Sequence, residues 1–254
     1  MIQMAAPCPA SIAPQATQSL LVLAGGEVSG RRQRVIQWEG RPAEHMILVE
    51  AGWIAGSILL SNGARQIVSL YLPGDLIGVE GLFGDRATEN LMPVTDAKYR
   101  MIPLLRARKT VASDAALSFE LLRASAAATL AAKNHTTSIG RTPAAARVAG
   151  LLVDLAYRLG HARDNGPCEF ECLLNQEQIG DYTGLTSVHV NRTLKRMEEA
   201  GLIRRKNSVV IIPDLAALAR EGEILRHELT LNDGTCVGRI GAAEDFYAVP
   251  TTVA

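Results

Sequence analysis

Two short stretches between residues 175 and 213 carry apolar residues at helical spacing. Ile179 and Tyr182 share one face of the first stretch, and Gly184 is suited to end that helix because glycine adopts left-handed backbone angles without strain. The second stretch has a similar stripe, formed by Val190, Leu194 and Met197. Two apolar runs follow on either side of a polar turn, Leu202-Ile203 and Val209 to Ile212. This pattern predicts a helix-turn-helix with a two-stranded wing.

Polar residues at the helix ends support the same prediction. Asn175 can cap the first helix while Gln178 reaches back to it, and Thr186 can cap the second. Gly180 is small enough to let the two helices cross closely. An ordinary helical hairpin inside a core is the competing interpretation, but it accounts for fewer of these features. We therefore expect a DNA-reading module.

The exposed face of the second helix has the chemistry that base recognition needs. Arg192 can pair bidentately with guanine, Asn191 with adenine, and Val188 can meet a thymine methyl group. The basic residues farther along would lie nearer phosphates, which supplies affinity without sequence information: Lys195, Arg196, Arg204, Arg205 and Lys206. The residues expected to contact DNA are Gln176, Thr186, Ser187, Val188, His189, Asn191, Arg192, Lys195, Arg196 and Lys206.

The first half of the chain has a different pattern, with short apolar runs separated by turn residues. Ser61-Asn62-Gly63 predicts a hairpin turn in which both central residues adopt positive φ. Pro73-Gly74-Asp75 interrupts the runs once more. The predicted strands are Val35–Trp38, Met46–Val49, Trp53–Leu60, Gln66–Leu72, Leu76–Gly78 and Pro93–Ile102. Short strands at this spacing predict an antiparallel β-roll or barrel.

A long helix is predicted between these two regions, because the stretch from Asp114 to Ile139 contains neither glycine nor proline. Small and apolar residues step along it by three and four, as in the seam of a coiled coil: Leu117, Leu121, Ala124, Ala128, Ala131, His135 and Ser138. A helix packed on its own barrel would show the same stripe. We favour a dimerisation helix, formed mainly through Leu117, Leu121, Ala124, Ala128 and Ala131, because a two-fold DNA reader needs an axis.

Composition limits the remaining possibilities. Lys and Arg number 26 and Asp and Glu 26, so the chain has no net charge and a basic patch must be local. The first basic residue is Arg31, and no apolar run reads as a membrane span, so we expect a cytoplasmic protein. Cys168 and Cys172 fit a half-buried strand better than a metal site. We expect no metal and no cofactor, and no catalytic triad or phosphate-binding loop indicates an enzyme.

Together these patterns predict an α+β protein with an antiparallel β-roll, a long dimerisation helix and a C-terminal winged helix-turn-helix. The expected segments are a flexible arm at 1–20, the roll at 21–112, the dimerisation helix at 113–140, the DNA-binding domain at 141–227 and a tail at 228–254.

This arrangement resembles the CRP/FNR family of bacterial transcription regulators from about Arg34 to Arg220. The most specific matches are Leu72-Pro73-Gly74-Asp75 with Gly78, and the helix-turn-helix from Gln176 to Lys195. The resemblance implies a cyclic-nucleotide-binding-domain-like roll and a homodimer on a palindromic double-stranded DNA site. It also implies RNA polymerase as a further partner, and no membrane.

The chain departs from the family's cyclic-nucleotide binders at the expected effector pocket. In those proteins a glutamate follows the glycine that matches Gly78, whereas Val79 follows it here. They also present an Arg-Ser pair to the phosphate farther along, where this chain has Glu89-Asn90. A carboxylate facing a phosphate repels it. On the long helix, Ala132 and Lys133 stand where the family's cAMP sensors have two hydroxyl residues that meet the base. The candidate pocket residues are Gly78, Val79, Glu80, Arg86, Ala132 and Lys133.

The sequence therefore predicts a dimeric, sequence-specific transcription regulator that does not depend on a cyclic nucleotide. Two alternatives stay open. The roll could bind another small molecule, or haem and a gas, and gate the same regulator. The chain could instead be a non-DNA interaction module, which the basic wing and Arg192 argue against.

Overall fold

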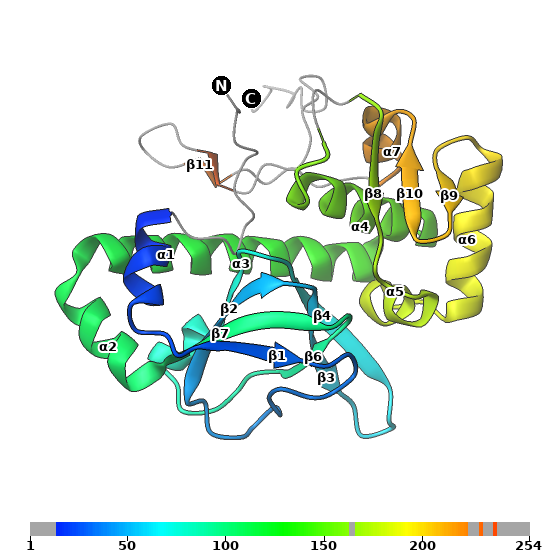
Figure 1. Ribbon diagram of the computed structural model, residues 1–254. Coiled ribbons are helices and arrows are strands. Elements are labelled where there is room, and N and C mark those ends of the chain that lie inside the picture. Colours follow the sequence, from blue (N-terminus) through cyan, green and yellow to red (C-terminus); the bar gives the residue numbers. More distant parts are fainter. Residues whose placement is uncertain (1–13, 163–165, 223–228, 231–235, 238–254) are drawn as a thin grey trace, which may run out of the picture.

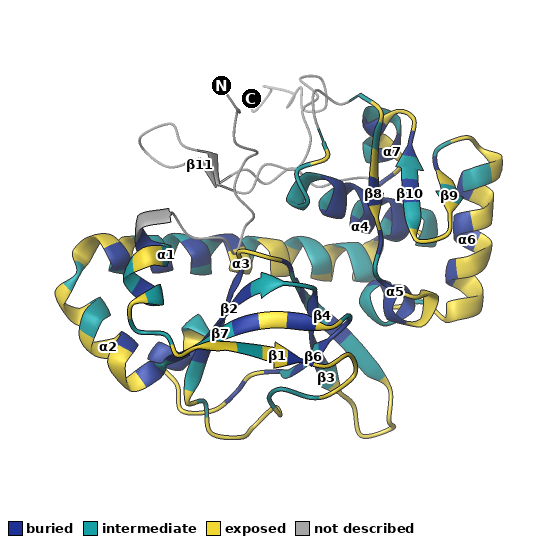
Figure 2. Cartoon of the chain, in the orientation of Figure 1, coloured by how far each residue is buried: buried dark blue, intermediate teal, exposed yellow. Residues whose placement is uncertain are grey.

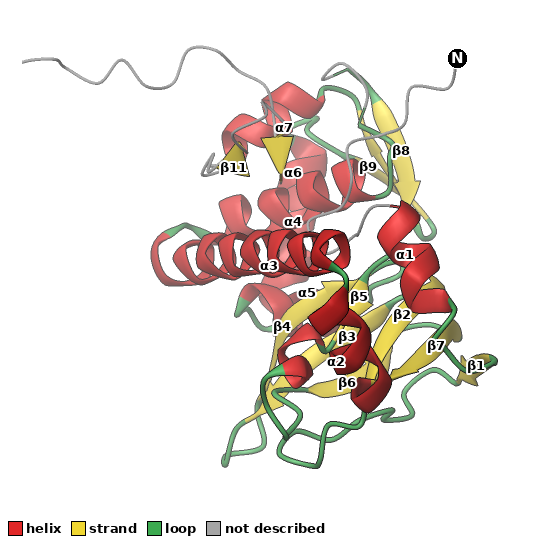
Figure 3. Cartoon of the chain, turned by 90° about the vertical axis from the view of Figure 1, so that its left-hand side faces the viewer, coloured by secondary structure: helices red, strands yellow, loops and turns green. Residues whose placement is uncertain are grey.

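The computed structural model describes residues 14–162, 166–222, 229–230 and 236–237. An antiparallel β-roll lies beside the long helix α3 (Ala115–Arg141), and a small helical domain lies at the C-terminal end of that helix (Figure 1). Viewed along α3, the roll lies on one side of the helix and most of the helical domain on the other (Figure 3). The predicted α+β architecture is confirmed.

Two antiparallel sheets form the roll. One has the strand order β1-β7-β2-β5 and the other β4-β3-β6. Their strands are β1 (Glu27–Gly30), β2 (His45–Ala51), β3 (Ile54–Leu59), β4 (Arg65–Tyr71), β5 (Leu76–Ile77), β6 (Asn90–Pro93) and β7 (Ala97–Pro103). The short 3-10 helix η1 (Val79–Leu82) follows β5, and α2 (Leu104–Ser113) follows β7.

Strand β2 has apolar residues on both faces because it is covered on both sides. Ile47 and Val49 belong to the cluster inside the roll, whereas Met46 and Leu48 belong to the cluster shared with α3. The predicted hairpin joins β3 to β4, but only Gly63 in its turn has a positive φ, of 83°. The expectation that both central residues do so was wrong.

Three other details of the roll differ from the prediction. Val35–Trp38 forms no regular strand, and only Gln37 makes an isolated bridge, to Leu91. The run Pro93–Ile102 is divided between β6 and β7 by a bend at residues 94–95. Strand β1 was not predicted, since Glu27–Gly30 has little hydrophobic alternation.

The expected flexible arm at 1–20 is wrong for its described part. Helix α1 (Pro14–Leu21) packs on the roll and α3, and Leu20 is fully buried there. Ala16 is also buried. Residues 1–13 lie outside the described part of the chain.

Helix α3 begins at Asp114, whose carboxylate accepts a hydrogen bond from the backbone N–H of Leu117 at 2.9 Å. The first half of the predicted dimer seam faces the chain's own roll, because Leu117, Leu121 and Ala124 are only 1%, 3% and 4% exposed. These three residues are therefore not free for a dimer contact, and the alternative of a helix packed on its own barrel is correct for them.

An apolar stripe runs along the other side of α3, and we call it the outer stripe: Phe119, Leu122, Ala126 and Leu130. Phe119 and Leu122 are 57% and 63% exposed. In Figure 2, exposed and buried positions alternate along the helix as expected for one covered and one open face. By length and composition alone α3 could cross a membrane, but a single such helix is weak support for a span.

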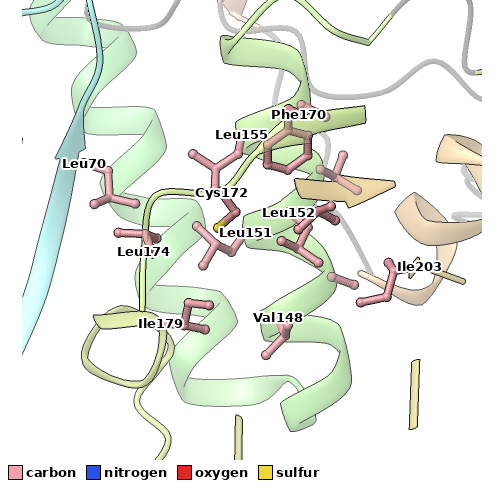
Figure 4. Packing of buried hydrophobic residues seen from close by; sticks show 14 of the residues in the cluster. Leu70, Val148, Leu151, Leu152, Leu155, Phe170, Cys172, Leu174, Ile179 and Ile203 are labelled. Atoms are coloured by element: carbon pink, nitrogen blue, oxygen red, sulfur yellow. The ribbon is translucent and has the colours of Figure 1, made fainter. Parts of the chain in front are cut away.

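The DNA-binding domain is built on α4 (Ala144–Arg158), α5 (Gln176–Thr183), α6 (Ser187–Glu199) and α7 (Leu215–Glu221). A sheet of order β8-β10-β9 completes it, with β8 (Cys168–Glu171), β9 (Arg204–Lys206) and β10 (Val209–Ile212). Leu151 and Leu155 of α4 converge with Phe170 of β8 and Ile179 of α5 in its core (Figure 4). The first wing strand begins at Arg204 rather than at the predicted Leu202-Ile203, because Ile203 is buried in this core.

The roll is joined directly to the DNA-binding domain. Leu70 of β4 belongs to the same apolar cluster as α4. Arg158 donates to the carboxylate of the fully buried Asp75 at 2.6 Å and to the carbonyl of Leu70 at 2.7 Å. Arg65 donates to Asp181 of α5 at 2.7 Å. These contacts fix the orientation of the helix-turn-helix relative to the roll.

Candidate DNA-binding interface and roll pocket

The helix-turn-helix has the local geometry that its sequence predicts. Asn175 and Gln178 form a reciprocal capping box, with hydrogen bonds of 2.8 and 3.0 Å. Gly184 ends α5 with a φ of 68°. A Cβ atom at Gly180 would collide with the carbonyl oxygen of Leu185, so this position needs glycine for the two helices to cross.

Helix α6 buries its apolar stripe and exposes its polar face. Val190, Leu194 and Met197 are at most 3% exposed, which anchors the helix against the domain core. The hydroxyl of Thr186 accepts from the N–H of His189 at 3.2 Å and so caps the helix. All of the residues expected to contact DNA are exposed: Gln176, Thr186, Ser187, Val188, His189, Asn191, Arg192, Lys195, Arg196 and Lys206. The outward side of α6 is correspondingly the exposed one in Figure 2.

The wing lies against the end of the same helix. Lys206 is exposed beside the turn of the β9–β10 hairpin, where Asn207 has a φ of 57°. Arg205, which sequence reasoning had assigned to phosphate contact, is instead paired with Glu198 at 2.7 Å. This hydrogen-bonded pair lowers the pKa of the Glu198 carboxyl. Arg205 therefore holds the wing to α6. The exposed basic residues that remain for DNA contact include Arg192, Lys195, Arg196 and Lys206.

The residues expected to form an effector pocket do not gather at one site. Val79 packs in the cluster around Leu121 of α3. Arg86 is exposed and donates to the carbonyl of Gly40 at 2.8 Å, while Glu80 accepts from Thr88 at 2.9 Å. Ala132 lines a different cavity, between α3 and the DNA-binding domain.

Gly78, with a φ of 82°, leads into η1, and Lys133 is exposed on α3.

A buried carboxylate occupies the roll near the position where the resemblance puts the phosphate. Glu89 is 6% exposed, and the Tyr71 hydroxyl donates to it at 2.5 Å. A Cβ atom at Gly56 would collide with this carboxylate. Burial raises the pKa of Glu89 to about 7, and the nearby charge of Glu80 adds to the rise while the bond from Tyr71 opposes it. Sequence reasoning noticed Glu89 but missed Tyr71 and Gly56, which lie far from it in the chain.

The cysteines give no indication of a metal site. Cys168 and Cys172 are free thiols, and burial raises the pKa of both. Within the described ranges there is no group of three His, Cys, Asp or Glu side chains that could hold a metal. Cys8 and the side chain of Cys236 lie outside the described part of the chain.

Comparisons with known proteins match both halves of the chain. Residues 27–114 match the cyclic nucleotide-binding domain, and residues 146–221 match the Crp-like helix-turn-helix domain. The nitrogen fixation regulation protein FixK of Azorhizobium caulinodans is 32% identical over 195 residues, which cover 74% of this chain and 76% of that protein. The transcriptional activator protein FnrL of Cereibacter sphaeroides is 26% identical, covering 74% of this chain and 77% of FnrL.

The fold is also found among solved structures. That of FixK2 from Bradyrhizobium japonicum superposes with a TM-score of 0.70 at 27% identity, covering 78% of this chain and 96% of FixK2.

Proposed function

The chain belongs to the CRP/FNR family of DNA-binding transcription regulators, and from that premise we propose that it binds a palindromic operator as a homodimer without a cyclic nucleotide. The observation that carries this proposal is helix α6, which exposes every residue expected to read bases while its apolar stripe is buried. RNA polymerase is the further partner that the family implies. Such a regulator acts on the chromosome, inside the cell.

The outer stripe of α3 is the surface that we propose for dimerisation. Phe119 and Leu122 are large apolar side chains that remain 57% and 63% exposed in a single chain. Pairing two copies along this stripe would cover them, and the small Ala126 between them and Leu130 would let the helices approach. A two-fold axis along α3 would present two copies of α6 to the two halves of a palindrome.

Base recognition is assigned to the first two turns of α6. Arg192 forms no ion pair within the described residues and is exposed, so its guanidinium is available to a guanine edge. Asn191 and Val188, which is 60% exposed, are available to adenine and to a thymine methyl group. Lys206 on the wing would contact phosphate.

Independence from cyclic nucleotides rests on Glu89. A nucleotide phosphate in this region of the roll would meet a carboxylate that Tyr71 and the close packing at Gly56 hold in position. Arg86, the arginine among the candidate pocket residues, is exposed and bonded to a backbone carbonyl. We expect titration calorimetry with cAMP and cGMP to give no binding tighter than millimolar, and a micromolar constant would contradict this part of the proposal.

The DNA-binding proposal is tested with an operator selected from random duplexes and a scrambled duplex, each at two salt concentrations. Arg192→Ala should weaken cognate binding by ~1–3 kcal/mol for each half-site and leave scrambled binding nearly unchanged. Lys206→Ala should weaken both equally and lower the salt slope by ~1. Arg106→Ala, an exposed position on α2, is the matched control and should change neither. If Arg192→Ala lowers both affinities by the same factor, Arg192 contacts phosphate and does not read sequence.

A further inference from the structure

A cavity of about 190 Å³ lies where the roll, the long helix and the DNA-binding domain meet. Strand β4, helix α3, helix α4 and helix α5 supply its walls, and Figure 1 shows these elements converging beside the C-terminal half of α3. Its apolar walls include Val68, Leu70, Ala131, Ile139 and Leu151. Of the six candidate effector residues only Ala132 lines it, and none of the roll-loop residues Gly78, Val79, Glu80 and Arg86 does.

The charged groups on the cavity wall are not all neutralised. Arg158 is paired with Asp75 at 2.6 Å and with Asp154 at 3.5 Å. Arg147 has no carboxylate partner among the described residues. Its Nε donates to the carbonyl of Thr142 at 2.9 Å and its Nη1 to that of Thr183 at 3.3 Å. The half-buried guanidinium is therefore bonded to two backbone carbonyls and to no carboxylate among the described residues.

The other titratable groups on the wall do not offset this charge. His135 bonds through Nε2 to the carbonyl of Tyr182 at 2.8 Å, and burial lowers its pKa, so the ring is neutral at neutral pH. Asp154 is paired with Arg158 at 3.5 Å, and burial raises the pKa of its carboxyl. The wall as a whole favours an anion near Arg147.

We propose that this cavity binds a small monocarboxylate with an apolar body, of the size of benzoate or hexanoate, its carboxylate on Arg147. A guanidinium has five N–H donors in a fork that matches a carboxylate, and the two carbonyl contacts leave donors unused. The apolar body would pack against Val68, Ala131 and Leu151. The volume is below the roughly 300–1,000 Å³ of pockets for drug-sized ligands, which limits the ligand to a small acid.

Arg147 also joins the α3–α4 junction at Thr142 to the end of α5 at Thr183. A ligand held by this side chain would brace the helix-turn-helix against the long helix. The binding proposal itself does not rest on DNA recognition, because ligand binding is measured on the protein alone. A negative result in the operator experiment would not contradict the ligand-binding proposal. A negative result in the ligand titration would not contradict the DNA-binding proposal.

The test is titration calorimetry of the full chain with benzoate and hexanoate, each compared with its neutral amide, benzamide or hexanamide. We expect measurable binding of the acids and at least ~10-fold weaker binding of the amides, a factor equivalent to ~1.4 kcal/mol. Arg147→Gln should bring the acids down to the level of the amides, and Arg147→Lys should keep part of the preference. Arg141→Gln, which removes an exposed arginine at the end of α3, is the control for general charge loss and should have no effect.

A second variant keeps the proposal testable if Arg147→Gln does not fold. Ala131→Leu fills the cavity without touching its charge, and it should abolish binding of the acids. The proposal is overturned if neither acid binds the wild type at millimolar concentration or if acid and amide bind equally. It is also overturned if folded Arg147→Gln keeps the wild-type affinity, or if Ala131→Leu does.

Discussion

The buried carboxylate in the roll has a measurable consequence for stability. The pKa of Glu89 rises from an ordinary value of 4.5 to about 7 in the folded chain, chiefly because the side chain is buried. Between these values the folded protein holds more protons than the unfolded chain, so stability must fall as the pH rises through this window. Each unit of difference between the two pKa values corresponds to about 1.4 kcal/mol. The total stabilisation from the protonated Glu89 that is lost once the pH exceeds 7 is therefore roughly 3 kcal/mol.

Glu89→Gln isolates this contribution. The amide keeps the shape of the side chain and an oxygen that can accept from Tyr71, but it carries no charge at any pH. The assay is urea unfolding at pH 5 and at pH 8. Relative to the variant, the wild type should lose roughly 2.5 kcal/mol between the two conditions, because at pH 5 part of the total is already lost, so that Glu89→Gln is the more stable protein at pH 8.

The comparison with the variant is essential because Asp154 is also buried and its pKa is also raised, so the wild type alone would not identify the group. Glu39→Gln, at an exposed position, is the control and should change stability equally at both pH values. If the free energy of unfolding changes equally between pH 5 and pH 8 in the wild type and in Glu89→Gln, the Glu89 carboxylate is hydrated. The inference that Glu89 is buried beside Tyr71 with a raised pKa would then be wrong.

The remaining predictions concern the dimer and the helix-turn-helix. Leu122→Glu puts two like charges into the proposed dimer contact, which costs several kcal/mol, and sedimentation should show a shift to monomer. Ala128→Glu, at an exposed position that lines the junction cavity and lies outside the outer stripe, should leave the dimer intact, and a monomeric wild type at micromolar concentration would refute the assignment. Gly180→Ala introduces a Cβ against a backbone carbonyl and should destabilise the DNA-binding domain by ~1–3 kcal/mol in thermal unfolding. Unchanged stability would mean that the helices can move apart.

Local chemistry made the helix-turn-helix predictable from sequence. The capping box at Asn175, the left-handed turn at Gly184 and the apolar stripe from Val190 to Met197 each depend on neighbours within a few residues. The pairing of Arg205 was not predicted from the sequence. Its partner Glu198 lies on another element, and a sequence pattern cannot distinguish an exposed base from a paired one.

The first half of the predicted seam of α3, at Leu117, Leu121 and Ala124, was wrong for a related reason. Periodicity identifies which positions share a face of a helix, but it does not say what that face meets. Leu117 and Leu121 repeat as a dimer seam would, yet they pack on α1 and β2 of the same chain. The outer stripe at Phe119 and Leu122 was overlooked because it is interrupted by polar residues. It can be recognised only once the structure shows which face of α3 is buried against the roll.

The two candidate ligand sites, in the roll and at the junction, also explain why loop similarity is a poor guide to the ligand. The roll keeps the Gly78 turn of nucleotide binders, but its interior polar site is satisfied by the chain's own Glu89 and Tyr71, so a phosphate would have to displace a held carboxylate. At the junction of α3, α4 and α5 the balance is reversed. Arg147 has a charge and unused donors beside an open apolar cavity, so an anionic ligand would replace no existing ion pair among the described residues. A ligand that controls this regulator is therefore expected at the junction, where it can act directly on the orientation of α5 and α6.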